Sequence, residues 1–544
     1  MKKHKLFIKH WMEFKPYKKQ GKVELYYLKV ANKIYSNLDW YTRLTTEEVL
    51  FEEELAMLCC FLTCYFEDVI SKTNVWNTFR QEHQKLYGKK LPFYEISPDY
   101  LDDEINLEDI KFLIWYFAST IQDTQFLNPD NAFIEDIANS AFEVFDREFE
   151  YAPENDQLQP FLKFDVKDAD FYETRAFIQQ VFFDTYLFYP DTKVRLKYDI
   201  ETLFEDHPET DPDTAMAEIR HLTELYTFNI HNALLAYSAS HWASKFLGAA
   251  HAAHKGITGI SKKINSYFFF DHHTQDEVFL EHIASGMSFK MTKESFDHAS
   301  ELEKGDIIFI GLVKWRDQWW FSGNYLKNKF DADLILDLKN SEKERAEVQF
   351  LYDQAEIATI LKKQEEAFLA YNNGSQIAFV DGKDIPTFLS DYFEFYNESL
   401  GISEEDRNEA AQKQKNEGYL KNPEDKEHRS ENLDEPLIVF FNPSHGIELI
   451  DDVFGAFPDK NNPYFEKETK EDFLHMVCST DISKEFVDYC VETYKNDLSF
   501  FKTAPYANYL EDLDFLMRFY KRQHYFTRPG VILTGLADKK MQQQ

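Results

Sequence analysis

The sequence has little cysteine, glycine and proline, and it lacks any long apolar run. Its 544 residues contain five Cys, 17 Gly and 17 Pro. Gly and Pro are each about 3% of the chain, against averages of roughly 7% and 5%. A chain poor in both residues favours long helices and has few places for glycine-rich phosphate loops.

The glycine spacing excludes several common enzymes. No two glycines are separated by a single residue, so GxG-type dinucleotide and kinase loops are missing. At the one P-loop spacing, Gly530 and Gly535, Leu536 stands where lysine is required. HExxH, GxSxG and EF-hand patterns are also missing. We therefore expect no Rossmann enzyme, P-loop NTPase, zincin or α/β-hydrolase.

The cysteines and the apolar runs predict a cytoplasmic protein. No CxxC pair occurs, which leaves no zinc ribbon and no thioredoxin-like motif. The longest strongly apolar stretch, Leu55–Phe66, has 12 residues, against about 20 needed to span a bilayer. The N-terminus lacks the apolar core of a signal peptide. We expect reduced thiols, a cytoplasmic location and no membrane partner.

Positive charge is scarce except at the N-terminus. Residues 1–22 hold eight Lys and one acid, Glu13, so this arm carries +7. The whole chain carries −36, which leaves −43 on the body and argues against broad nucleic-acid binding. Two interpretations of the arm stay open. It packs against its own acidic body, or it binds nucleic acid or an acidic partner through residues such as Lys3 and Lys5.

Hydrophobic periodicity predicts an α+β protein that is predominantly α-helical. Apolar residues at helical spacing predict helices at 46–71, 107–125, 131–150, 170–189, 470–477, 483–501 and 509–522, and one or two long helices within 214–254. The predicted parts are a basic arm (1–22), a helical domain (23–204), a long-helix region (214–301), a β module with inserted helices (302–401), a charged flexible loop (402–436) and an α/β C-terminal part (437–544).

The β module is predicted from a Trp-rich hairpin. Lys304–Gly323 holds two runs of β-branched and aromatic residues around a polar turn. Further short strands are predicted at Leu334–Leu338, Ile377–Val380, Leu437–Phe441, Ile447–Ile450 and Val531–Leu533. Together these strands predict one small sheet or barrel of SH3-like or OB-like size.

The hairpin supplies the candidate partner-binding residues. Alternation places Trp315, Trp319 and Phe321 on one face and Trp320 near the other, with Arg316 in the turn. An exposed ring there would stack on a base, a sugar or a proline. The alternative is that all of these rings pack inside the protein.

Histidines supply a candidate metal site. Six lie within 42 residues, and His251 and His254 share a face if their segment is helical. With His272 they form the alternative metal set, which Asp271 and Glu281 could complete. Clustered histidines are more often satisfied by hydrogen bonds or solvated, so the sequence favours no metal, no cofactor and no identified catalytic residue.

Several stretches together resemble a bacterial family catalogued only as a domain of unknown function. They are Tyr65–Ser71, Leu86–Phe93, Asp103–Asp109 with Phe112–Trp115, Gly305–Ile307 with Trp319-Trp320, and Phe441–Pro443. The resemblance covers about residues 20 to 535. It implies a bacterial, cytoplasmic, stand-alone protein and carries over no activity, cofactor or catalytic residue.

The sequence favours a non-enzymatic interaction or scaffold protein that binds a protein or nucleic-acid partner. The warrant is a helical body, a Trp-rich β module and a charged loop without catalytic motifs. Two alternatives stay open: a metal-assisted hydrolase that uses the histidines of 241–282, and an acidic inhibitor that mimics nucleic acid.

Overall fold

Helices packed on helices and two small sheets make up the chain. The computed structural model describes residues 6–122, 125–166, 168–206, 211–401, 408, 435–502 and 506–526. The fold is α+β and predominantly helical, as the sequence predicts. The chain divides into unit 1, residues 1–263, 313–324 and 508–522, and unit 2, residues 264–312, 325–507 and 523–544.

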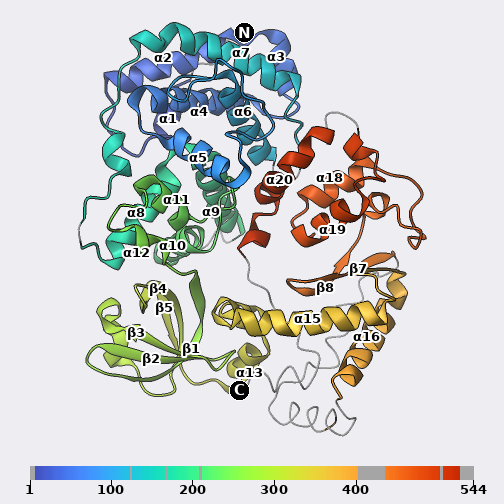
Figure 1. Ribbon diagram of the computed structural model, residues 1–544. Helices are drawn as coiled ribbons and strands as arrows, with labels where there is room; N and C mark the ends of the chain where they lie inside the picture. The colour runs from blue at the N-terminus through green and yellow to red at the C-terminus, as the bar shows by residue number, and fades with distance from the viewer. Residues whose placement is uncertain are drawn as a thin grey trace. The chain divides into compact units, whose positions relative to one another are not determined.

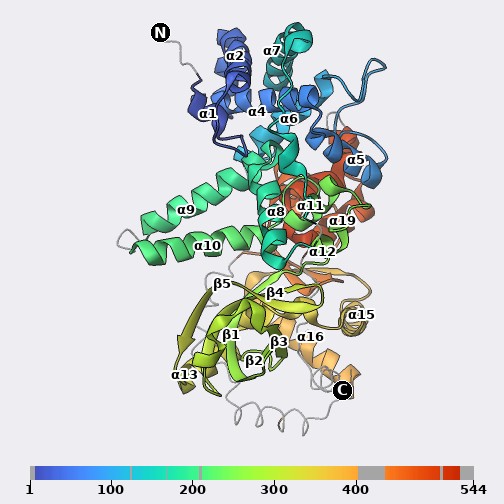
Figure 2. The same ribbon diagram turned by 90° about the vertical axis from the view of Figure 1, so that its left-hand side faces the viewer.

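Unit 1 is built from helices (Figures 1 and 2). They are α1 (Ile8–Met12), α2 (Lys22–Asn37), α3 (Trp40–Thr46), α4 (Glu52–Ser71), α5 (Val75–Tyr87), α6 (Leu107–Gln122), α7 (Ala132–Glu148), α8 (Phe171–Asp184), α9 (Val194–Asp206), α10 (Pro212–Phe228), α11 (Ala239–Leu247), α12 (His254–Thr258) and α20 (Leu513–Tyr520). Figure 2 shows α9 and α10 side by side.

The apolar helix α6 lies at the centre of unit 1. Every residue from Phe112 to Phe117 is at most 1% exposed, because a helix that is apolar on all sides is stable only when it is surrounded. α20 comes from far along the chain and packs on it, with the rings of Trp115 and Phe519 4.8 Å apart. The predicted helix over 107–125 is confirmed as far as Gln122.

The long helices predicted over 214–254 are interrupted. α10 ends at Phe228, and α11 begins only at Ala239. Between them Leu235 and Ala236 take positive φ angles of 64° and 54°, which a helix does not allow. The hydroxyl of Ser238 then caps α11 by accepting from the His241 amide.

A five-stranded closed barrel in the order β1-β2-β3-β5-β4 follows. Its strands are β1 (Lys263–His273), β2 (Glu277–His282), β3 (Ser288–Thr292), β4 (Ile307–Trp315) and β5 (Gln318–Asn328). The predicted hairpin is confirmed as β4–β5. The prediction of long helices up to 301 is wrong for β1 to β3: Ile264, Ser266, Phe268 and Phe270 are buried at every second position, which is the strand period.

Unit 2 holds a three-stranded sheet, β6 (Ile377–Val380), β7 (Leu437–Asn442) and β8 (Gly446–Ile450), in that order. These three strands agree with the sequence prediction. The predicted strand at Leu334–Leu338 is wrong, because this segment lies in α13 (Ala332–Asn340), which Asp331 caps. The predicted strand at Val531–Leu533 and nearly all of the predicted loop 402–436 lie outside the described residues.

Helices cover both faces of this sheet (Figure 1). On one side α15 (Gln354–Tyr371) and α16 (Ile385–Ser399) bring Phe368 and Tyr392 against Phe441. On the other side α19 (Lys484–Tyr494) packs Phe486 5.2 Å from the ring of Phe440. α14 (Glu342–Ala346) and α18 (Lys470–Cys478) complete the α-helices described for unit 2. With both faces buried, β7 reads as a continuous apolar run, which explains why it was predictable.

Candidate metal centre

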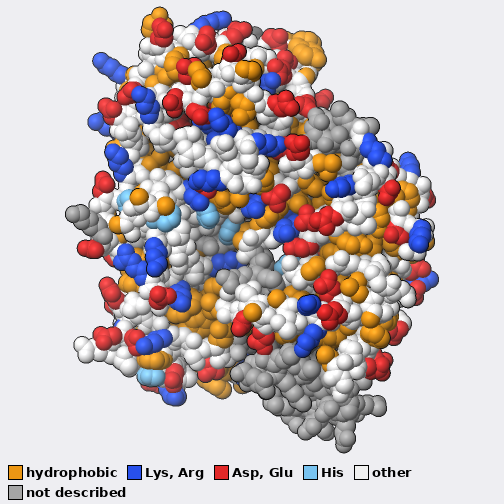
Figure 3. All heavy atoms as spheres, viewed as in Figure 1, with side chains coloured by type: hydrophobic (Ala, Val, Ile, Leu, Met, Phe, Trp, Pro, Cys, Tyr) orange, Lys and Arg blue, Asp and Glu red, His pale blue; other side chains and the backbone are white. Residues whose placement is uncertain are grey.

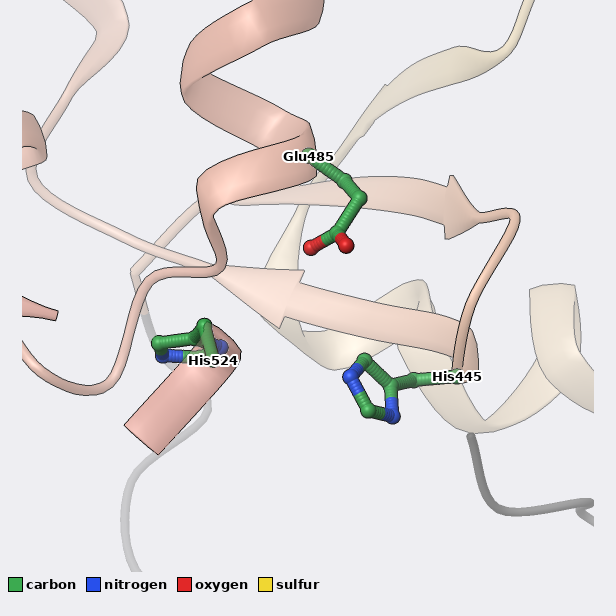
Figure 4. A group of neighbouring side chains, drawn as sticks. All are labelled: His445, Glu485 and His524. Carbon is green, nitrogen blue, oxygen red and sulfur yellow. The ribbon is translucent and has the colours of Figure 1, made fainter. Parts of the chain in front are cut away.

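Three side chains from separate elements of unit 2 converge in Figure 4: His445, Glu485 and His524. Their ligand atoms all lie within 4.8 Å of one another, and all three residues are half-buried. Within the part of the chain that the structure describes, no other three His, Cys, Asp or Glu side chains approach one another in this way. We call this group the His–Glu–His site.

The tight turn between β7 and β8 positions His445. The side-chain oxygen of Asn442 accepts a hydrogen bond from the Ser444 amide at 2.8 Å, and the Asn442 carbonyl accepts from the His445 amide at 3.2 Å. Gly446 follows with φ +87°, a conformation that favours glycine. The turn therefore projects His445 from the end of the sheet at a fixed place.

Glu485 lies in the first turn of α19, whose start is braced against the sheet. The Ser483 hydroxyl caps the helix by accepting from the Phe486 amide at 3.1 Å. The Ser483 amide donates to Glu448 Oε1 at 2.8 Å, and Asn442 donates to Glu448 Oε2 at 3.1 Å. Glu448 on β8 thus joins the turn that carries His445 to the helix that carries Glu485.

His524 lies in the short helix Arg522–Tyr525, and its Nε2 is 2.9 Å from the carbonyl oxygen of Thr480. A carbonyl only accepts, so Nε2 carries the hydrogen. In a neutral imidazole this leaves the lone pair on Nδ1, the arrangement of a metal-binding histidine held by a backbone carbonyl. Gln523 donates to the same carbonyl at 2.9 Å, which fixes the segment further.

The electrostatics of the site leave one carboxylate oxygen without a partner. Glu485 Oε2 is shielded from solvent and has no hydrogen-bond partner among the described residues. Burial alone would raise the pKa of Glu485, but the Lys484 ammonium, 3.4 Å away, the helix-start amide, His445 and the Ser444 hydroxyl together lower it. Burial lowers the pKa of His445, opposed in part by the charge of Glu485. An anionic carboxylate beside a neutral imidazole is the state that binds a cation.

Two imidazole nitrogens and one carboxylate oxygen form a donor set of intermediate hardness. It suits Zn²⁺ and other divalent transition metals better than Mg²⁺ or Ca²⁺, which prefer oxygen. Around a tetrahedral ion with bonds of about 2.1 Å the ligand atoms would stand about 3.4 Å apart. The side chains therefore need only small rotations to close on an ion, and three protein ligands leave one position open.

The histidines predicted to form a metal set do not form this site. In unit 1, His251 Nδ1 accepts from the Ala253 amide at 3.2 Å, and His254 Nδ1 lies 3.2 Å from the Ser244 carbonyl. In unit 2, His272 near the end of β1 stacks on Phe279 with centroids 4.2 Å apart and pairs with Asp271. Hydrogen bonds engage the Nδ1 atoms of all three histidines, and ring stacking also engages His272.

His282 of the same sequence cluster belongs to the barrel interior. Its Nε2 lies 2.8 Å from Ser266 Oγ and its Nδ1 2.7 Å from Ser285 Oγ. The residue is fully buried, and burial lowers its pKa to about 4. It is a neutral structural histidine held between two hydroxyls.

Two of the hairpin rings, Trp315 and Trp320, are buried. Trp315 and Trp320 are 3% and 5% exposed, and both pack on Phe171 of unit 1. The predicted faces were wrong because the turn has two residues: β4 ends at 315 and β5 begins at 318, so odd positions on β4 share a face with even positions on β5. Trp319 is half-buried, and Arg316 is exposed with its guanidinium 4.1 Å from the Trp315 ring.

The described part of the basic arm packs on unit 1. Trp11 is fully buried and stacks on Tyr27 at 6.0 Å. The ammonium of Lys15 lies 3.8 Å from the Trp11 ring and forms a buried ion pair with Glu67. Lys3 and Lys5 lie outside the described residues.

Sequence reasoning missed the His–Glu–His site because nothing local marks it. His445 and Glu485 are 40 positions apart along the chain, and Glu485 and His524 are 39 positions apart. Each histidine stands alone in its segment, so no i, i+3 or i, i+4 pair signals a ligand set. Only the tertiary fold of unit 2 brings the three together.

The comparisons identify a family for this chain. A family model described as "Protein of unknown function (DUF3843)" matches residues 5–277, and the chain belongs to this family. The resemblance to a family known only as a domain of unknown function is thus confirmed for residues 5–277, and the His–Glu–His site lies beyond them. No similar protein was found among the curated proteins or among the solved structures. Among the described helices none has both the length and the apolar character needed to span a bilayer.

Proposed function

We propose that this family member binds a divalent transition metal, Zn²⁺ first among them, at the His–Glu–His site and uses it for metal-assisted hydrolysis. The observation that carries the proposal is the convergence of His445, Glu485 and His524 within 4.8 Å. The buried, unpartnered Oε2 of Glu485 supports it independently. A buried acceptor without a partner costs about 1–3 kcal/mol, and a bound cation removes that cost.

Hydrolysis is favoured over a purely structural role by the number of ligands. Structural zinc sites close with four protein ligands, whereas catalytic sites use three and leave a position for water. A metal ion held there would lower the pKa of bound water to about 7 and so would supply hydroxide at neutral pH. The same ion polarises a carbonyl or phosphoryl oxygen of the substrate. The sequence-based alternative was a hydrolase that uses the histidines of 241–282. The hydrolase proposed here uses His445, Glu485 and His524 instead.

The test is metal binding by the full chain. The protein is stripped with chelator, titrated with Zn²⁺ by calorimetry and assayed for bound metal after desalting. We expect one ion per chain, and at least tenfold weaker binding in His445→Ala, His524→Ala and Glu485→Gln, because each removes one of three ligands. Loaded protein should hydrolyse p-nitrophenyl acetate or bis(p-nitrophenyl) phosphate, and the Glu485→Gln variant should not.

The matched control is the double variant His251→Ala/His254→Ala, with His272→Ala beside it. These changes remove the histidines of the sequence-based metal set and should leave stoichiometry and affinity unchanged. Loss of zinc in the control, or full retention in all three site variants, would sink the proposal. Tight zinc binding without turnover of either ester would indicate a structural metal site and would refute the proposed hydrolase activity.

We also propose a reducing, cytoplasmic setting for this protein. All five cysteines are buried free thiols. Burial raises the pKa of Cys59 and of Cys64 to about 12, so neither ionises readily. Buried, unreactive thiols support a compartment in which disulfides are not used for stability.

A further inference from the structure

α3 and the start of α4 expose an apolar surface that the interior of unit 1 does not use. Trp40, Tyr41 and Leu44 of α3 are 75%, 57% and 47% exposed, and Phe51 before α4 is 77% exposed. At about 200 Å² for each large side chain, these fractions leave roughly 500 Å² in contact with solvent. The exposed area of these four side chains is comparable to that of the largest apolar patch on an ordinary monomer, which is often functional. We call these four residues the α3 surface.

The geometry of α3 explains why these side chains point outward together. Trp40 and Leu44 are one helical turn apart, and Tyr41 and Leu44 are three residues apart, so all three share one face. Thr42 and Thr46 are buried on the other face, and α3 contacts α7. The helix is held by its polar residues and presents its large apolar ones.

Acidic side chains border the α3 surface. The segment 39–54 has six acids and one base, a net charge of −5. Glu47, Glu48 and Glu53 are exposed. The single base, Arg43, donates to the carbonyls of Leu38 and Tyr35 and covers the Tyr35 ring at 4.3 Å, so it does not neutralise the border. Figure 3 shows hydrophobic side chains gathered over α3 at the upper edge, with acidic ones beside them.

This charge pattern selects among possible occupants. Nucleic acid and anionic lipid headgroups are repelled by an acidic border. A second copy of the chain related by a two-fold axis would set the acids of one copy against those of the other. A protein segment with apolar side chains flanked by Lys and Arg would pack on the aromatic rings and pair with the bordering carboxylates. Exposed Trp and Tyr are also the residue types that dominate binding energy at protein interfaces.

We propose that the α3 surface docks a basic amphipathic helix of a partner protein. Its apolar face lies on Trp40, Tyr41, Leu44 and Phe51, and its Lys or Arg side chains pair with Glu47, Glu48 and Glu53. The sequence predicts an interaction protein, and this proposal places the interaction at the α3 surface rather than at the Trp-rich hairpin. It is independent of the metal proposed at the His–Glu–His site.

The probe is a fluorescein-labelled designed helix of Leu and Lys in an amphipathic pattern, titrated with full-length protein by anisotropy. A Leu/Glu peptide of the same pattern and a Lys-rich peptide without leucine are the peptide controls. We expect saturable binding of the Leu/Lys helix, weakened by salt, and at least tenfold weaker binding of both controls. Trp40→Ala/Tyr41→Ala should weaken binding at least tenfold, as should the charge reversal Glu48→Lys/Glu53→Lys.

The matched protein controls are Tyr198→Ala and Glu205→Lys, an exposed aromatic and an exposed acid on α9. Because all of the substituted side chains are exposed, the variants should fold, which circular dichroism checks. Binding of the Leu/Glu helix as tight as that of the Leu/Lys helix would overturn the proposal. So would equal losses in the α9 controls, or a concentration-dependent dimer in light scattering that Trp40→Ala abolishes, since the occupant would then be a second copy.

Discussion

The ion pair between Lys15 and Glu67 makes the role of the basic arm measurable. Lys15 is 5% exposed and Glu67 is 1% exposed, so neither charge has water to solvate it. Lys15→Met leaves the Glu67 carboxylate buried with one remaining donor, Asn155 at 2.8 Å. Breaking one half of a buried pair costs about 3–5 kcal/mol, and we expect a loss of this size in the free energy of unfolding of unit 1.

The assay is urea unfolding followed by tryptophan fluorescence. All eight tryptophans of the chain lie in unit 1, from Trp11 to Trp320, so their emission reports unit 1 and not unit 2. The double variant Lys15→Met/Glu67→Gln removes both charges and keeps an acceptor for Asn155. It should recover at least half of the loss in a double-mutant cycle.

Two results would refute this reasoning. A loss below 1 kcal/mol in Lys15→Met would mean that the arm is not anchored through this pair. A double variant as unstable as the sum of the two single variants would mean that the two charges do not interact. Lys9→Met, on the short helix α1 with an exposed side chain, is the control and should change stability by less than 1 kcal/mol.

The stability of the protein should depend on pH in two ranges, because buried tyrosines and a buried histidine have shifted pKa values. Burial raises the pKa of Tyr65, Tyr116 and Tyr186 far above 10, so above pH 10 the unfolded chain loses protons that the folded chain keeps. Stability should fall by about 1.4 kcal/mol per pH unit for each such tyrosine, and the tyrosinate absorbance of these buried side chains should appear only as the chain unfolds; a complete absorbance change before unfolding would contradict this. Burial lowers the pKa of His83 to about 4, so its stabilising effect is complete above pH 6.5 and is lost as the pH falls towards 4. His83→Gln keeps a donor for the Lys89 carbonyl and should remove up to about 3 kcal/mol of that acid dependence, measured by urea unfolding between pH 4 and 7; an unchanged slope would show that other groups cause it.

The parts of the fold that the sequence predicts are those with strong local patterns. Phe112–Phe117 is apolar without interruption inside a helical period, and β7 is a β-branched and aromatic run, so both elements were found. β1 was missed because the prediction of long helices was extended past Ala236–Ala253 to 301. The faces of Trp315 and Trp320 were assigned wrongly because alternation was counted straight through a two-residue turn.

Function-related residues were harder to predict for a physical reason. His445, Glu485 and His524 meet only after the β7–β8 turn, the cap of α19 and the segment after α20 are all in place. No spacing along the chain records that geometry. The α3 surface was equally hidden, since Trp40, Tyr41 and Leu44 have the spacing of a buried helix face.

The place of α20 on α6 has a consequence for synthesis of the protein on the ribosome. Phe515 and Phe519 pack on Trp115, yet about 400 residues separate these partners along the chain. Domains usually fold from the N-terminus as they emerge, at roughly 5–20 residues per second. Unit 1 cannot close in this way, because its last helix emerges only after nearly all of unit 2 has been made. The apolar side of α6 therefore stays uncovered for tens of seconds, at about 20–80 s for 400 residues, and the nascent chain needs protection from aggregation during that interval.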